Sequence, residues 1–245
     1  MNTSLKNTGE IENRRKESLI MKLKSITVVL LFGLWTAFTL AGSVWAFLFI
    51  VGPNSITQSD VISSDNIILI LVFLIYLCGG GLWGLGIARL MNADVKSVVK
   101  ACAVSWTATV FAFLMVVVFL GSFFGGFSKI NFLPIFLHSR HYNFLLVFVP
   151  SVGMITAINS YVATGTLGFK ELKKSVGMYT GLAAALGFLA VGLILFFGFG
   201  WEVGYAHPGK FGMLLIFLIC SIGGALVGGT TMGWVLQKSR IRLDS

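Results

Sequence analysis

Three histidines are the residues of this chain best suited by type to hold a metal ion. His138 and His141 are spaced H-x-x-H in LPIFLHSRHYNF, and His207 lies in YAHPGK. Imidazole nitrogens are common ligands of zinc and copper. Arg140 lies between the first two histidines, however, and no carboxylate accompanies them. A metal site is therefore only a minor alternative, and the sequence predicts no cofactor.

A polar run inside an otherwise apolar stretch is the best candidate for a binding site. The run TAINSYVATGT covers 156–166 and follows Pro150, which favours a kink in a helix. At helical spacing, positions i, i+3 and i+4 share a face. Two interpretations stay open: the wall of a polar path or pocket, and hydrogen bonding between helices. The predicted polar pocket comprises Thr156, Asn159, Ser160, Tyr161 and Thr164.

Groups for other chemistry are missing from the apolar segments. All nine Asp and Glu residues lie in the connections and tails, whereas ion-coupled transporters commonly place ionisable groups inside the membrane. No P-loop, G-x-S-x-G or H-E-x-x-H motif occurs. The sequence therefore predicts that the protein is not an enzyme.

Composition indicates which kind of scaffold must position these residues. Of the 245 residues, 56% are hydrophobic and 11% are charged, against about 25% charged in soluble domains. A membrane-spanning helix needs about 20 mostly apolar residues. Six segments meet this length, so we expect an all-α polytopic membrane protein with six transmembrane helices, near 26–51, 67–91, 98–126, 143–167, 174–200 and 211–236.

Two short stretches of these segments are especially dense in glycine, CGGGLWGLG (78–86) and IGGALVGG (222–229). Glycine weakens a helix in water, but in lipid small residues let helix backbones approach closely. Spacing by four places them in rows on single helix faces. The predicted helix-packing residues are Gly80, Gly84, Ala88, Gly224, Gly228, Gly229 and Gly233. Packing inside the chain and a seam for a partner subunit or a second copy are both open interpretations.

The same two segments resemble each other. LVFLIYLCGGGLWG (71–84) and LIFLICSIGGALVG (215–228) are identical at eight of fourteen positions. With weaker similarities among the odd-numbered segments, this suggests three hairpin repeats, a device known from transporters. Shared Leu, Phe and Gly content is the alternative explanation.

Basic residues are distributed unevenly along the chain. Fifteen of the 18 Lys and Arg residues fall in the N-terminal stretch, the second and fourth connections and the C-terminal tail. This positive-inside bias places both termini in the cytoplasm and explains the net charge of +9 without nucleic acid as a partner. The expected organisation is an N-terminal tail (1–25), a transmembrane domain (26–236) and a basic tail (237–245). Anionic membrane lipids are expected neighbours of this side.

Tryptophans divide into two expected groups. Trp83 and Trp234 lie near the inner ends of their segments, where aromatic belts form, whereas Trp35 and Trp106 lie deeper and are expected to pack. Taken together, these features favour a non-enzymatic structural or accessory subunit of a larger membrane complex, partnered by other membrane subunits or by its own copies. The alternative is a passive transporter or channel for a neutral or apolar solute or lipid.

Overall fold

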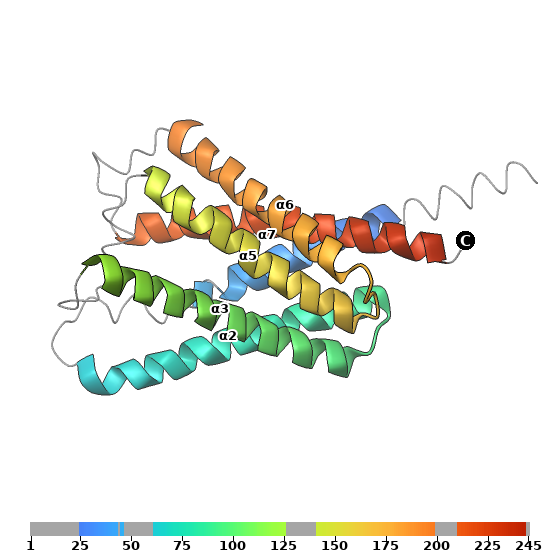
Figure 1. Ribbon diagram of the computed structural model, residues 1–245, viewed down its shortest axis with the longest axis horizontal. Helices are drawn as coiled ribbons and strands as arrows, with labels where there is room; N and C mark the ends of the chain where they lie inside the picture. The colour runs from blue at the N-terminus through green and yellow to red at the C-terminus, as the bar shows by residue number, and fades with distance from the viewer. Residues whose placement is uncertain (1–24, 44, 47–60, 126–140, 199–209, 244–245) are drawn as a thin grey trace, which may run out of the picture.

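The computed structural model describes residues 25–43, 45–46, 61–125, 141–198 and 210–243, and within these ranges it is helical, without a strand. The N-terminal helix covers Ser25–Ser43. It is followed by α2 (Val61–Met91), α3 (Val95–Gly125), α5 (His141–Thr166), α6 (Lys173–Leu193), a π-helical turn η1 (Ile194–Gly198) and α7 (Lys210–Leu243) (Figure 1). The all-α class is thereby confirmed for the described residues.

Five of these helices are long and apolar enough to cross a membrane, which is typical of an integral multi-pass protein. The spans, sought among the described residues, are Ser25–Ser43, Ile70–Met91, Val95–Phe113, Lys173–Phe197 and Leu215–Ser239. The sixth predicted span, α5, is not among them. Its described part contains Pro150 and the polar run 156–166, which lower its hydropathy. The structure thus supports five spans and leaves the six-span count as a prediction.

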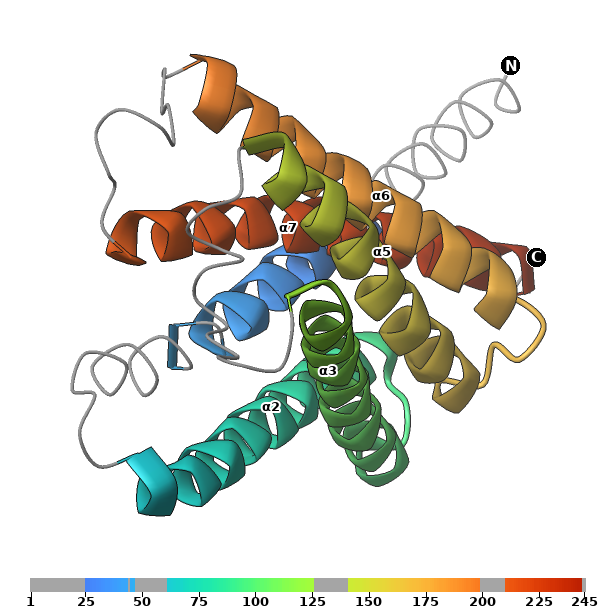
Figure 2. The ribbon, with the colours of Figure 1, turned by 60° about the vertical axis from the view of Figure 1, so that its left-hand side comes forward.

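The helices pack in chain order around the bundle. Extensive contacts join α2 with α3, α5 with α6, and α6 with α7, and smaller ones join α3 with α5 (Figures 1 and 2). The N-terminal helix completes the circuit, because Trp35 lies against Gly86 of α2 while Phe32 lies against Gly233 of α7. A helix that crosses a membrane bonds its backbone groups within itself, so side chains are left to make these contacts between helices.

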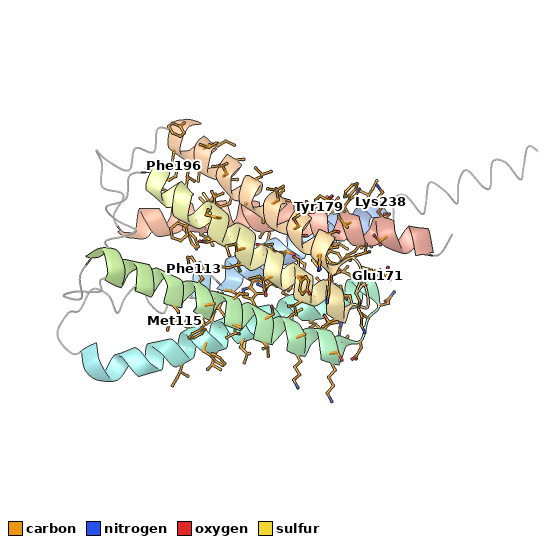
Figure 3. All side chains as sticks on the ribbon, viewed as in Figure 1. Phe113, Met115, Glu171, Tyr179, Phe196 and Lys238 are labelled. Carbon is orange, nitrogen blue, oxygen red and sulfur yellow. The ribbon has the colours of Figure 1, made fainter. Side chains whose placement is uncertain are left out.

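Two apolar cores lie inside the bundle. The larger draws on the N-terminal helix, α2, α3, α5, α6 and α7, and includes Phe32, Ile87, Val98 and Val176, all fully buried. The second surrounds Phe188 and receives residues from α3, α5, α6, η1 and α7. Figure 3 shows Phe113 and Phe196 on the side of this second core, away from Glu171 and Lys238. The first core therefore unites all the helices, and the second unites the later ones.

Two short turns close one end of the bundle, which we call the basic end. It carries Arg89, Lys96, Lys100, Lys170, Lys173, Lys174 and Lys238. Asn92 (φ 52°) ends α2 and Gly168 (φ +94°) follows α5, so each turn contains one left-handed residue. The next amide in each case bonds five residues back, from Ala93 to the Ala88 carbonyl and from Phe169 to the Thr164 carbonyl. Both turns therefore have the same helix-ending motif.

The helix ends differ from the predicted ones for local reasons. α3 begins at Val95, three residues earlier than expected, because the Asp94 carboxylate accepts the amide hydrogens of Lys96 and Ser97 at 3.3 and 3.2 Å. This is N-capping. α7 continues to Leu243, through most of the predicted tail 237–245, where Gln, Lys, Arg and Leu are good helix formers.

Candidate functional site

Asn159 of α5 forms the main polar contact between two helices. Its side-chain oxygen accepts a hydrogen bond from the Ser105 hydroxyl of α3 at 2.7 Å. Its amide nitrogen donates to Thr109 Oγ1 of α3 at 3.1 Å and to the Ile155 carbonyl at 2.9 Å. Thr109 in turn donates to the Ser105 carbonyl at 2.9 Å, which closes the loop. Asn159 is 6% exposed, and its oxygen and both of its amide hydrogens are hydrogen-bonded inside the protein.

The other residues of the predicted polar pocket do not share one environment. Ser160 and Thr164 are buried, at 1% and 0% exposure, whereas Thr156 is half-buried. Tyr161 is 36% exposed, and its ring lies 4.9 Å from Lys173 Nζ. The α5 face toward α3 therefore carries the amide, a second face carries buried hydroxyls, and Tyr161 lies at the surface.

Four buried hydroxyls have no hydrogen-bond partner in the described structure. They belong to Ser160 and Thr164 of α5, Thr180 of α6 and Ser221 of α7. A buried hydroxyl without a partner costs about 1–3 kcal/mol. Sequence reasoning found the first two but missed Thr180 and Ser221. Their positions inside apolar runs were the available signal, because a hydroxyl there must face a helix neighbour.

The glycine row of α2 lies against α3. A Cβ at Gly80 would be 2.8 Å from the Cys102 carbonyl oxygen, and one at Gly84 would be 3.1 Å from the Val98 carbonyl oxygen. The first distance is shorter than real Cβ atoms show, and the second is tighter than most real Cβ contacts. Ala88, one turn further, is fully buried. These residues make a close contact between helices of the same chain.

The two glycine rows of α7 lie against different helices. A Cβ at Gly224 would be 2.8 Å from the Ala184 carbonyl oxygen of α6, and one at Gly228 would be 2.9 Å from Ala184 Cβ. On the other row, Gly229 and Gly233 face Phe32 of the N-terminal helix, at 2.9 Å from its carbonyl oxygen and 2.8 Å from its Cβ. All seven predicted packing residues thus lie on contacts or in the core within one chain.

These contacts do not follow the predicted hairpin repeat. Gly80 and Gly84 align with Gly224 and Gly228 in sequence. In the three-hairpin scheme, α7 pairs with α6 inside one repeat, whereas α2 would pair with the N-terminal helix. Gly80 and Gly84 contact α3 instead. The aligned glycines therefore contact helices that are not equivalent, and the repeat stays a prediction.

Trp83 is not in an aromatic belt, and that expectation is wrong. Trp83 is 3% exposed, packs edge-on against Trp106 at 5.4 Å, and donates its indole hydrogen to Thr36 Oγ1 at 3.0 Å. The N-terminal helix covers it, which the position of Trp83 near a helix end could not show. Trp106 is buried as expected, at 6% exposure, and Trp234 is 55% exposed beside Lys238.

The described part of the chain offers no site for a metal ion. No group of three His, Cys, Asp or Glu side chains there is placed to hold an ion. His138 and His207 lie outside the described residues, and His141 is the first residue of α5. The histidine site thus keeps the status of a minor alternative.

One carboxylate at the basic end has a shifted pKa. The Ser97 hydroxyl donates to Asp94, and with the Ser97 and Lys96 amides it holds the pKa of this carboxyl below its ordinary value of 3.8. The arrangement is a helix cap on the surface, and nothing around it resembles a catalytic acid or base. Its role is therefore in folding.

Comparisons with protein-family models, with curated proteins and with solved structures found no match. Function is therefore inferred from the geometry alone.

Proposed function

We propose that this chain is a non-enzymatic, structural or accessory subunit of a larger membrane complex. The observation that carries the proposal is the closed hydrogen-bond loop of Asn159 with Ser105 and Thr109. This amide is the most polar group on the predicted site face; its oxygen and one of its hydrogens bond to α3, and its other hydrogen bonds within α5. A side chain engaged in this way serves assembly of the bundle rather than chemistry on a substrate.

The outward faces are the surfaces left for partners. The predicted glycine rows face other helices of the same chain, which argues against their forming a seam for another subunit. Large apolar side chains point outward instead, among them Leu34, Phe38, Met115 and Leu182, each more than half exposed. Lipid or a partner subunit, including a second copy of the chain, covers such side chains in a membrane.

The proposal includes a membrane topology. We infer that α5 is a sixth span, because its neighbours α3 and α6 are long and apolar enough to be spans and it packs against both. We further infer that the basic end faces the cytoplasm, with both termini, because the positive-inside rule orients short loops. Protease or tag accessibility in sealed vesicles tests both inferences.

Co-purification tests the proposed subunit role. The tagged chain, extracted from its own membrane in mild detergent, is expected to retain other membrane proteins, or copies of itself, at fixed stoichiometry. Outward substitutions such as Leu182→Trp on α6 and Leu34→Trp on the N-terminal helix would then locate the interface, since only the variant at the interface should lose the partner. A chain that always elutes alone would refute the proposal.

A passive transporter for a small neutral or apolar solute is the second candidate. The unpartnered hydroxyls of Ser160, Thr164 and Thr180 favour it, because a moving solute needs groups that the protein does not occupy itself. Solute flux into vesicles should then fall in Thr180→Val and Thr156→Val but persist in the outward control Leu182→Ala. Equal flux in all of these variants, or in empty vesicles, would remove this candidate.

A further inference from the structure

Four buried hydroxyls behave unlike the other serines and threonines of the described helices. Most of those donate to a carbonyl of their own helix, three or four residues back, which is the usual arrangement in an apolar interior. Members of this larger group are Thr36, Thr39, Ser43, Thr107, Thr109, Thr166, Thr230, Thr231 and Ser239. Ser160, Thr164, Thr180 and Ser221 lack such a bond. Their hydroxyls are therefore free for another partner.

Three of the four come from one junction, where α5, α6 and α7 meet. A Cβ at Gly228 of α7 would be 3.3 Å from the Thr180 carbonyl oxygen of α6 and 3.4 Å from Thr156 Cγ2 of α5. Ser160 follows Thr156 by one helical turn on the same face of α5. Thr164 lies a second turn on, about 12 Å along the axis from Thr156. Thr180 and Ser160 therefore belong to neighbouring turns of adjacent helices, and Thr164 follows one turn further along α5.

A second contact places Ser160 beside the α6 turn that carries Val176 and Thr180. A Cβ at Gly177 would be 2.9 Å from the Ala157 carbonyl oxygen and 3.2 Å from Tyr161 Cβ. The α5 turn between those two residues is the one that contains Ser160. Val176 is fully buried and shares an apolar core with Ala163 of α5. Val176 is thus the apolar residue best placed to report on this junction.

The chemistry of the junction selects a neutral ligand that both donates and accepts hydrogen bonds. Hydroxyls carry no charge and supply both kinds of group. An ion buried here would lack a countercharge and would be strongly disfavoured. Buried water molecules typically make about three hydrogen bonds, to polar groups that are otherwise unsatisfied. Ser160, Thr164 and Thr180 are such groups, and their spread over two turns of α5 calls for more than one water.

We propose that Ser160, Thr164 and Thr180 bind internal water at the junction of α5, α6 and α7. The water satisfies the three hydroxyls and makes this part of the bundle hydrated, while the α2–α3 contact stays dry. Ser221 is left out, because it lies next to Cys220 in the second apolar core. The proposal depends on neither candidate function, since a packed subunit and a transporter could both hold such water.

Radiolytic labelling tests the proposal on the intact protein in lipid nanodiscs. A millisecond X-ray pulse converts water to hydroxyl radicals, which modify side chains beside bound water even where bulk solvent is excluded. Val98 of α3 is the matched control: like Val176 it is fully buried in the first turn of its helix, but its neighbour at i+4 is Cys102 instead of a threonine. We expect Val176, beside bound water, to be modified several-fold faster than Val98.

The triple variant Ser160→Ala, Thr164→Val, Thr180→Val connects the water to these hydroxyls. We expect it to reduce the labelling of Val176 to the rate of Val98. Wild-type Val176 as unreactive as Val98 would overturn the proposal. Labelling of Val176 that persists in the folded triple variant would overturn the assignment to these residues. If the variant does not fold, the wild-type comparison of Val176 with Val98 still decides. Solute flux plays no part in this readout, so failure here is distinct from failure of the transporter candidate.

Discussion

The α2–α3 pair and the α5–α6 pair are built on the same plan but differ in polar content. Each pair is joined by a short turn with one left-handed residue, Asn92 or Gly168, at the basic end. Each has a fully buried valine in the first turn of its second helix, Val98 or Val176. Both place glycines against the partner's backbone. Backbone-level contact therefore determines the shape of both pairs.

The two pairs differ in side chains that take no part in the contact between the backbones. In α3, Asp94 caps the helix and Cys102 occupies the buried row after Val98. In α6, the N-cap Leu172 makes no side-chain hydrogen bond, and Thr180 occupies that row with an unpartnered hydroxyl. The α2–α3 pair thus has a helix start bonded by its own side chain, whereas the α5–α6 pair has a buried hydroxyl without a hydrogen-bond partner. Any solute-related role belongs to the second pair.

Disrupting the glycine contact of either helix pair should have the largest effect on stability. Gly80→Ala introduces a Cβ 2.7 Å from Trp106 Cβ, and Gly181→Ala introduces one 2.6 Å from the Gly153 carbonyl oxygen. Overpacking of this kind costs about 1–3 kcal/mol. We expect both variants to lower the melting temperature in detergent, in either pair. Tryptophan fluorescence during heating would measure this.

The adjacent glycine provides the control. A Cβ at Gly81 would meet its nearest atoms at 3.8 and 3.9 Å, which is ordinary van der Waals contact. Gly81→Ala should therefore change the stability by less than about 0.5 kcal/mol. Equal effects of Gly80→Ala and Gly81→Ala would show that backbone proximity does not hold α2 to α3.

Removing the amide that joins the two pairs should have an intermediate effect. Asn159→Leu keeps the volume but abolishes the bonds to Ser105 and Thr109. Hydrogen bonds between membrane helices contribute about 0.6 kcal/mol on average and up to about 1.7. We expect a loss in this range, measured in a double-mutant cycle with Ser105→Ala. A coupling free energy of zero would mean that the bond does not join α3 to α5.

Removing the helix cap should have the smallest effect, and it should depend on pH. Asp94→Ala deletes the α3 cap, whereas Glu171→Ala removes the acid before α6, whose N-cap makes no side-chain bond. We expect a slightly lower melting temperature for Asp94→Ala alone. Because hydrogen bonds lower the pKa of Asp94 in the folded protein, its stabilisation is present above the ordinary value of 3.8 and is lost as pH falls through the lowered pKa.

A thermal-melting series from neutral to acidic pH checks this sign. The difference between wild type and Asp94→Ala should shrink on acidification, while Glu171→Ala should follow the wild type throughout. A difference that grows in acid would contradict the capping role.

Much of the scaffold could be predicted, because the bilayer restricts the choice. Long apolar runs specify helices, and glycines spaced by four specify close approach. The partner of each face could not be predicted. That Asn159 meets Ser105 and Thr109 depends on how α3 and α5 are rotated against each other, which no local pattern encodes. Trp83 was misplaced for the same reason, since the N-terminal helix, 47 positions earlier, covers it.

The candidate site was predictable in outline only. The row formed by Thr156, Ser160 and Thr164 can be read from helical spacing, but its lack of protein partners cannot. Thr180 joins it through the packing of α6, where glycines at 177 and 181 bring the two backbones together. The composition of one helix does not show which residues of another helix it will contact.

Native mass spectrometry of the chain extracted from its own membrane tests the central claim most directly. The subunit proposal predicts a complex of fixed mass in which this chain is accompanied by other membrane proteins or by further copies of itself. A population consisting only of the lipid-bound single chain, in a detergent that preserves other membrane complexes of the same membrane, would contradict it.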